Sequence, residues 1–261
     1  MILSPPRVVF GQTMVLRIVF GIVALFFAGI PFLIALGSNP NDFPGVPVGL
    51  AVLLGYGVLC FLISRTRLSI HAEGVQRTSA LGTKEMLWDE VAEYRYRIVP
   101  NQTGFAVGGL IGAAVQAAVE ASQWKPAGPP SITLVARDGR KLRVTPNVQG
   151  SEEAIEMIVA EVHNRLKPEL KRRLENNDEV AFGPLRLSSQ GVAWRGKDTI
   201  RLDEIDRVGI VGRKLRIRRK DKYFSTLAVP PEKIPNALLA LELIEGLRAW
   251  AGASQIAATF S

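Results

Sequence analysis

Two pairs of adjacent acids are the first residues in this sequence whose type and repetition suggest chemistry. Asp89 and Glu90 follow a tryptophan, and Asp203 and Glu204 follow a leucine in a similar context. Paired carboxylates perform acid–base catalysis when they converge on one substrate, but adjacent residues of a strand point to opposite faces. We therefore interpret both pairs as turns or strand entries, where Asp is favoured.

The sequence shows no pattern of residues that is typical of a metal site or of a catalytic nucleophile. His71 and His163 are the two histidines, and neither has a cysteine or a second histidine at ligand spacing. The single cysteine, Cys60, lies in an apolar run, so no disulfide framework is expected. No phosphate-binding glycine loop precedes a helix. We therefore predict a protein that is not an enzyme and carries no metal or other cofactor.

A basic segment is the strongest candidate for a binding site. Leu215 and Ile217 alternate with basic residues, which directs every second basic side chain to one outer strand face. The seven basic residues are Arg213, Lys214, Arg216, Arg218, Arg219, Lys220 and Lys222. Such a face attracts anionic lipid headgroups or an acidic partner; the alternative is a solvated face that only supports solubility. Nucleic acid is not expected, because no aromatic stacking motif accompanies the charge.

The elements that position this segment occur twice. A strand pattern begins at Leu68 and again at Leu185, each followed by a hairpin glycine, Gly74 or Gly191, and then by an acidic pair. Further strands are expected at 91–98, 131–135 and 141–144 in the first copy, and at 205–210, 214–218 and 223–229 in the second. Each copy ends in an amphipathic helix, from Ser151 and after residue 236, and residues 168–178 continue the first helix. Duplication of a fold is the simplest explanation.

The first copy contains an insertion that the second lacks, at residues 100–130. Gly104, Gly108 and Gly112 recur every four positions there, a spacing that lets helices approach closely. We interpret these glycines as a helix-packing or oligomerisation site. The alternative is a small-residue helix or loop that covers the first domain.

Two charge-free runs precede the copies, at 18–36 and 46–64. Each approaches the roughly 20 residues that cross a hydrocarbon core, and a non-basic turn joins them, so they predict a transmembrane helical hairpin. Arginines flank only the outer ends, which places the following region in the cytoplasm. Two alternatives are cleavage near residues 35–37 and a pair of buried core helices.

This combination resembles the pleckstrin-homology-like (PH-like) fold, and in particular bacterial membrane proteins with tandem PH-like domains of unknown function. The hairpin glycines, the acidic steps and the terminal helices carry the resemblance, over residues 65–252. It implies an α+β protein in which a transmembrane hairpin, 1–64, precedes two antiparallel β domains, 65–176 and 177–261, each closed by a C-terminal helix. It also implies recognition or assembly, because such domains commonly bind lipids, peptides or themselves.

The function expected from these features is that of a non-enzymatic, membrane-anchored adaptor or scaffold in the bacterial inner membrane. Its cytoplasmic domains would bind anionic lipid headgroups or protein partners, and it could form homo-oligomers or contact a membrane protein. A second hypothesis is a subunit or regulator of a membrane transport or secretion assembly. An enzyme is a third, which turnover lost on changing Asp89 or Asp203 would support.

Overall fold

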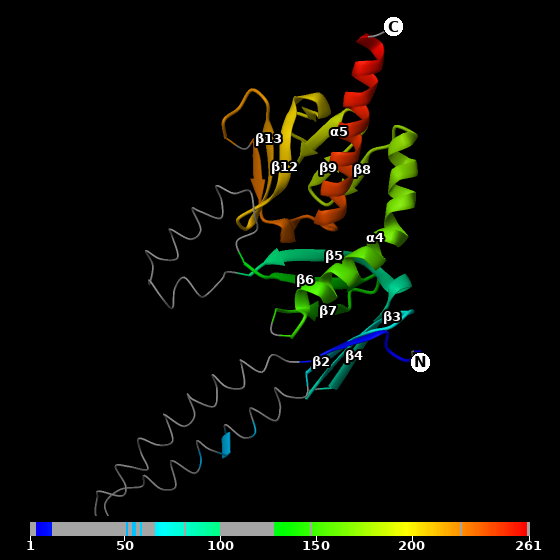
Figure 1. The fold of residues 1–261 in the computed structure, drawn as a ribbon, viewed down its shortest axis with the longest axis vertical. Helices are drawn as coiled ribbons and strands as arrows, with labels where there is room; N and C mark the ends of the chain where they lie inside the picture. The colour runs from blue at the N-terminus through cyan, green and yellow to red at the C-terminus, as the bar shows by residue number, and fades with distance from the viewer. Residues whose placement is uncertain are drawn as a thin grey trace, which may run out of the picture. The chain divides into compact units, whose positions relative to one another are not determined.

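The described chain contains four antiparallel sheets and two long helices (Figure 1). The computed structural model describes residues 4–11, 66–80, 82–99, 128–146, 148–224 and 226–259, together with positions 51, 54, 55 and 58, and it describes side chains up to residue 250. Contacts divide the chain into two compact units. One comprises residues 1–87 and 147–151, and the other comprises 88–146 and 152–261. The predicted division at residue 177 stays a prediction.

The first unit contains a four-stranded meander. Its strands are β1 (Val8–Phe10), β2 (Arg67–Ile70), β3 (Gly74–Ser79) and β4 (Gly82–Leu87), in that order across the sheet. Apolar side chains alternate with polar ones along β2, so that Leu68 and Ile70 are buried. Sequence reasoning missed β1, which is only three residues long and precedes the apolar runs.

The second unit begins with a three-stranded sheet and a long helix. The 3-10 turn η1 (Trp88–Glu90) leads into β5 (Val91–Ile98), β6 (Pro130–Ala136) and β7 (Lys141–Val144). Helix α4 (Ser151–Glu175) follows and has Pro168 inside it. Proline removes an intrahelical hydrogen bond, and α4 changes direction midway in Figure 1. The predicted helix start at Ser151 is confirmed, and the predicted continuation through residues 168–178 is confirmed as far as Glu175.

The same order of elements then recurs. A second four-stranded meander contains β8 (Val180–Phe182), β9 (Leu185–Leu187), β10 (Gly191–Trp194) and β11 (Ile200–Arg201). The 3-10 turn η2 (Leu202–Glu204) leads into the sheet of β12 (Ile205–Val211), β13 (Lys214–Arg219) and β14 (Leu227–Val229). Turn η3 (Pro231–Lys233) and helix α5 (Ala237–Thr259) close the chain.

The paired glycines have a steric reason. A Cβ on Gly74 would lie 2.4 Å from the carbonyl oxygen of Met86, and one on Gly191 would lie 2.2 Å from that of Ile200. Real Cβ atoms do not approach so closely, so each glycine lets its strand start against the backbone of the next strand. The acidic pairs lie in η1 and η2, directly before β5 and β12, which confirms the strand-entry interpretation.

The membrane part of the expected fold class is wrong on this structure. In the part of the chain that the structure describes, no helix is long and apolar enough to cross a membrane. Helix α5 buries Leu243 and Ile244 in a protein core and carries Glu242 and Glu245, while α4 is rich in charge. The two apolar runs lie outside the described residues except for positions 51, 54, 55 and 58. The structure therefore does not support the predicted transmembrane hairpin or the predicted localisation as an integral inner-membrane protein.

Candidate functional site

Strand β13 presents its basic residues as the alternation predicts. Leu215 and Ile217 are fully buried in the core, while Lys214 is exposed and Arg216 is half-buried on the opposite face. Strand pairing sets Arg218 beside Arg207 of β12, a residue that the sequence reasoning missed. We call the outer face of the β12–β14 sheet, with Arg207, Lys214, Arg216 and Arg218, the basic face.

Ion pairs fix part of the basic segment. Arg218 donates from Nε to Asp206, with a donor–acceptor distance of 2.8 Å, and Arg219 lies 3.0 Å from Glu204 and 3.2 Å from Asp221. Cross-strand neighbours of like charge, such as Arg207 and Arg218, are unfavourable, and Asp206 offsets part of that repulsion. The acids hold these guanidinium groups in place and leave the segment with an excess of positive charge.

Arg216 is placed differently from its neighbours. Its cross-strand partners are Gly209 on β12 and Ala228 on β14, so two small residues flank a long side chain. Its Nε is buried and has no hydrogen-bond partner among the described residues. A buried donor without a partner costs free energy, and such a group in a folded protein calls for an explanation.

The remaining predicted residues surround this face without belonging to it. Arg213, Lys220 and Lys222 are exposed at the two ends of β13. Tyr223 and Phe224, which follow, were expected to begin the next strand, but β14 begins only at Leu227. Gly104, Gly108 and Gly112 lie outside the described residues.

The acidic pairs do not converge. Asp89 pairs with Arg165 at 2.7 Å and Glu90 pairs with Arg140 at 2.9 Å. In the second copy, Arg201 and Arg219 neutralise the two acids separately. Each carboxylate therefore has its own cation. No group of three or more potential metal ligands occurs within the described ranges.

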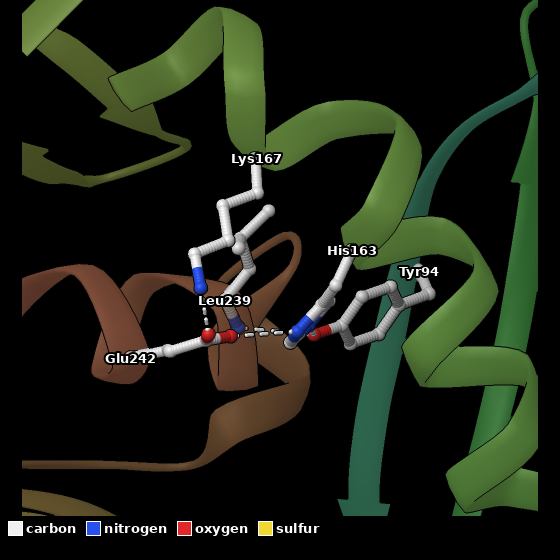
Figure 2. Close-up of polar contacts among 5 residues, drawn as sticks. All are labelled: Tyr94, His163, Lys167, Leu239 and Glu242. Carbon is white, nitrogen blue, oxygen red and sulfur yellow. Dashed lines mark hydrogen bonds and ion pairs between the residues drawn. The ribbon is translucent and has the colours of Figure 1, made fainter.

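A partly buried polar network joins β5, α4 and α5. The hydroxyl of Tyr94 lies 2.7 Å from Nε2 of His163, and Nδ1 of His163 lies 2.9 Å from Glu242. Figure 2 shows these side chains pointing toward one another. The backbone N–H of Leu239, in the first turn of α5, donates to the same hydroxyl at 3.1 Å, and Lys167 pairs with Glu242. We call these five residues the polar junction. Sequence reasoning missed it, since His163 showed no ligand spacing.

A neutral histidine satisfies every group of the polar junction. In that arrangement the Tyr94 hydroxyl accepts from the N–H of Leu239 and donates to Nε2 of His163, and Nδ1–H of His163 donates to Glu242. Burial lowers the pKa of His163, against the opposing effect of Glu242. The hydrogen bond from Lys167 lowers the pKa of Glu242, and burial raises that of Tyr94.

Asn236 completes the attachment of α5 to the first sheet. Its backbone N–H donates to the carbonyl of Tyr94 at 2.9 Å, and its side-chain oxygen accepts from the N–H of Tyr94 at 2.8 Å. Asn236 has a φ of 52°, a left-handed conformation that asparagine tolerates better than most residues. The start of the second closing helix thus depends on a strand of the first copy.

The described residues form an α+β protein, in which antiparallel sheets are combined with two long helices. Residues 118–250 match the model of a family described as a family of unknown function (DUF6585). The chain therefore belongs to this family. None of the curated proteins and none of the solved structures compared with the chain matches it.

Proposed function

We propose that this protein is a non-enzymatic adaptor built from two PH-like modules, and that its basic face binds an acidic segment of a partner protein. The twofold order of a four-stranded sheet, a three-stranded sheet and a closing helix supports the PH-like architecture. The observation that carries the binding proposal is Arg216, whose buried Nε has no hydrogen-bond partner among the described residues.

A carboxylate suits this position chemically. Guanidinium groups bind carboxylates through two parallel hydrogen bonds, and such charge-assisted bonds are roughly twice as strong as neutral ones. The cross-strand neighbours of Arg216, Gly209 and Ala228, are small residues without polar side chains that could bind the guanidinium group. Lys214 adds a second cation on the same face.

Protein is favoured over a lipid surface by how the basic face is built. A bilayer attracts summed charge from mobile basic residues, whereas Arg218 of the basic face is held by Asp206. Fixed guanidinium groups suit discrete carboxylates. Strand β14 is also the edge of its sheet, and an extended segment can add to an edge strand through main-chain hydrogen bonds.

The test uses the full chain and a fluorescein-labelled eight-residue peptide in which glutamate alternates with threonine. Fluorescence anisotropy should show salt-sensitive binding, and no binding of the same peptide with glutamine in place of glutamate. Lys214→Glu with Arg216→Glu should weaken binding by roughly thirtyfold or more, the scale of losing one central interface residue.

Lys141→Glu is the matched control, because Lys141 is an exposed lysine on β7, in the corresponding sheet of the first copy. It should leave peptide binding within a factor of about two, since exposed charges away from an interface affect affinity little. Equal losses in both variants would reduce the effect to overall charge and overturn the proposal. So would binding to phosphatidylserine vesicles without peptide binding, which would assign the basic face to lipid headgroups.

A further inference from the structure

Two adjacent aromatic side chains stand in solvent at the end of the β13–β14 hairpin. Tyr223 is 88% exposed and Phe224 is 80% exposed. Their rings contact each other edge to face, with centroids 5.3 Å apart. Single exposed apolar residues are ordinary, but an adjacent aromatic pair that buries so little of itself marks a contact surface. We call this pair the aromatic tip.

The corresponding hairpin of the first copy shows that the fold does not need the aromatic tip. There, β6 ends at Ala136 and β7 begins at Lys141, and a short polar turn joins them. Within this turn the backbone N–H of Arg140 donates to the side chain of Asp138 at 2.9 Å. Residues 137–140 include no aromatic residue. The second copy uses the longer loop 220–226 for the same connection.

The surroundings of the aromatic tip match the composition of protein interfaces. Exposed Lys220 and Lys222 precede it, and the strand that leads to it carries Arg216 and Arg218. Tyrosine, phenylalanine and arginine are enriched at the centres of interfaces, where a few such residues supply most of the binding free energy. Positive charge next to the rings favours a partner whose apolar site is bordered by acids.

We propose that Tyr223 and Phe224 are the apolar anchor of the interface whose charged part is the basic face. This inference rests on the proposed function and specifies the partner: a protein segment with a cluster of acids, followed at a fixed distance by a large apolar side chain. Strand β13 ends at Arg219, and Tyr223 follows in the loop, seven positions after Arg216. An extended chain advances about 3.3 Å per residue, so seven residues are the upper limit of this span, and the acids and the apolar side chain should be separated by no more than about six residues.

The experiment compares two labelled peptides on the full chain by anisotropy. Both contain four glutamates and a four-residue Gly-Ser spacer, followed by leucine in one and by serine in the other; each is also made with the reversed order. The wild-type chain should bind the leucine peptide about tenfold more tightly than the serine peptide, in one of the two orders. Tyr223→Ser with Phe224→Ser should remove this preference and keep the affinity for the serine peptide.

Trp250→Ser is the matched control, because Trp250 is another exposed aromatic side chain, 67% exposed on α5. It should keep the preference for the leucine peptide. A preference that survives Tyr223→Ser with Phe224→Ser, or that is absent from the wild-type chain in both orders, overturns the anchor while leaving the basic face intact. If neither peptide binds, the proposed function fails as well, and tip-dependent binding to phosphatidylserine vesicles would then assign the tip to lipid.

Discussion

The two three-stranded sheets of this chain share a framework and differ in what they carry on it. Both begin after a 3-10 turn, and both have a register irregularity near the start of the first strand, at Val91 and at Ile205. Their central strands bury equivalent pairs of apolar residues. The intervening positions differ. On β6 they are Ser131, which is buried, and Thr133 and Val135, which are half-buried; on β13 they are Lys214, Arg216 and Arg218. Positions common to both sheets make the fold, and positions that differ carry the candidate function.

The inner faces differ as well. Tyr94 on β5 corresponds to Val208 on β12, counted from the register irregularity of each sheet. Tyr94 is fully buried and bonded to both helices, whereas Val208 belongs to an apolar core. The first sheet therefore forms hydrogen bonds to both helices through Tyr94, whereas the second sheet contributes Val208 to an apolar core and carries the basic face.

The largest effect is expected where the two copies are the same. Gly191→Ala should destabilise the protein by about 3 kcal/mol, because the new Cβ would collide with the carbonyl of Ile200 and the strands would have to separate. Gly74→Ala should cost a similar amount for the same reason. Chemical denaturation measures both changes.

Gly246→Ala is the control for these glycines. A Cβ on Gly246 would meet no atom within 4 Å, and alanine is the better helix former, so this change should stabilise the chain by about 1 kcal/mol. If Gly191→Ala and Gly74→Ala also stabilise the chain, the steric account of the repeated glycines is wrong.

A smaller effect is expected where the inner faces differ. Tyr94→Phe removes the hydroxyl from the polar junction, so that the N–H of Leu239 and Nε2 of His163 each lose the hydrogen bond that they form with it. The cost should be about 2 kcal/mol of unfolding free energy, as for other buried groups that lose a partner. Tyr96→Phe, on the same face of β5, should change stability by less than about 0.5 kcal/mol. If Tyr94→Phe and Tyr96→Phe lower the unfolding free energy equally, the hydroxyl of Tyr94 does not stabilise the polar junction.

The smallest expected effect is a dependence of stability on pH. The pKa of His163 is lower in the folded chain than its ordinary value of 6.5, so the unfolded chain binds the proton more readily. Its contribution to stability is complete above pH 6.5 and is lost as the pH falls through the folded pKa. Glu242 has a lowered pKa as well, and its contribution is lost only at pH values below 4.5.

Unfolding midpoints between pH 8 and pH 5 should therefore decrease less in His163→Gln than in the wild-type chain. The buffer range stays above the ordinary pKa of Glu242, which separates the two groups. An identical pH dependence in both chains would show that His163 does not remain neutral in the polar junction.

The sequence predicts the strands where the side-chain alternation has a buried counterpart. Leu215 and Ile217 face a core, and the strand that contains them is found as expected. The strand predicted from Tyr223 begins at Leu227, because only from there do side chains reach the core. Tyr223 and Phe224 have high strand propensity, and propensity alone does not distinguish a strand from an exposed loop.

The polar junction could not be predicted, because its members come from distant parts of the chain. Tyr94 and Glu242 are 148 positions apart and meet only after two helices have packed on one sheet. The basic segment was found because its residues are contiguous in sequence. Which of its guanidinium groups form ion pairs depends on acids of the neighbouring strand, such as Asp206, and the sequence does not specify the register of that strand.

The attachment of Asn236 to Tyr94 has a consequence for the order in which the protein can be completed. Residues 88–99 leave the ribosome long before residues 236–242, which bind the backbone and the hydroxyl of Tyr94. During synthesis, the first sheet is therefore made before the residues that bind the backbone and the hydroxyl of Tyr94, so its interior can be completed only after residues 236–239 have been added.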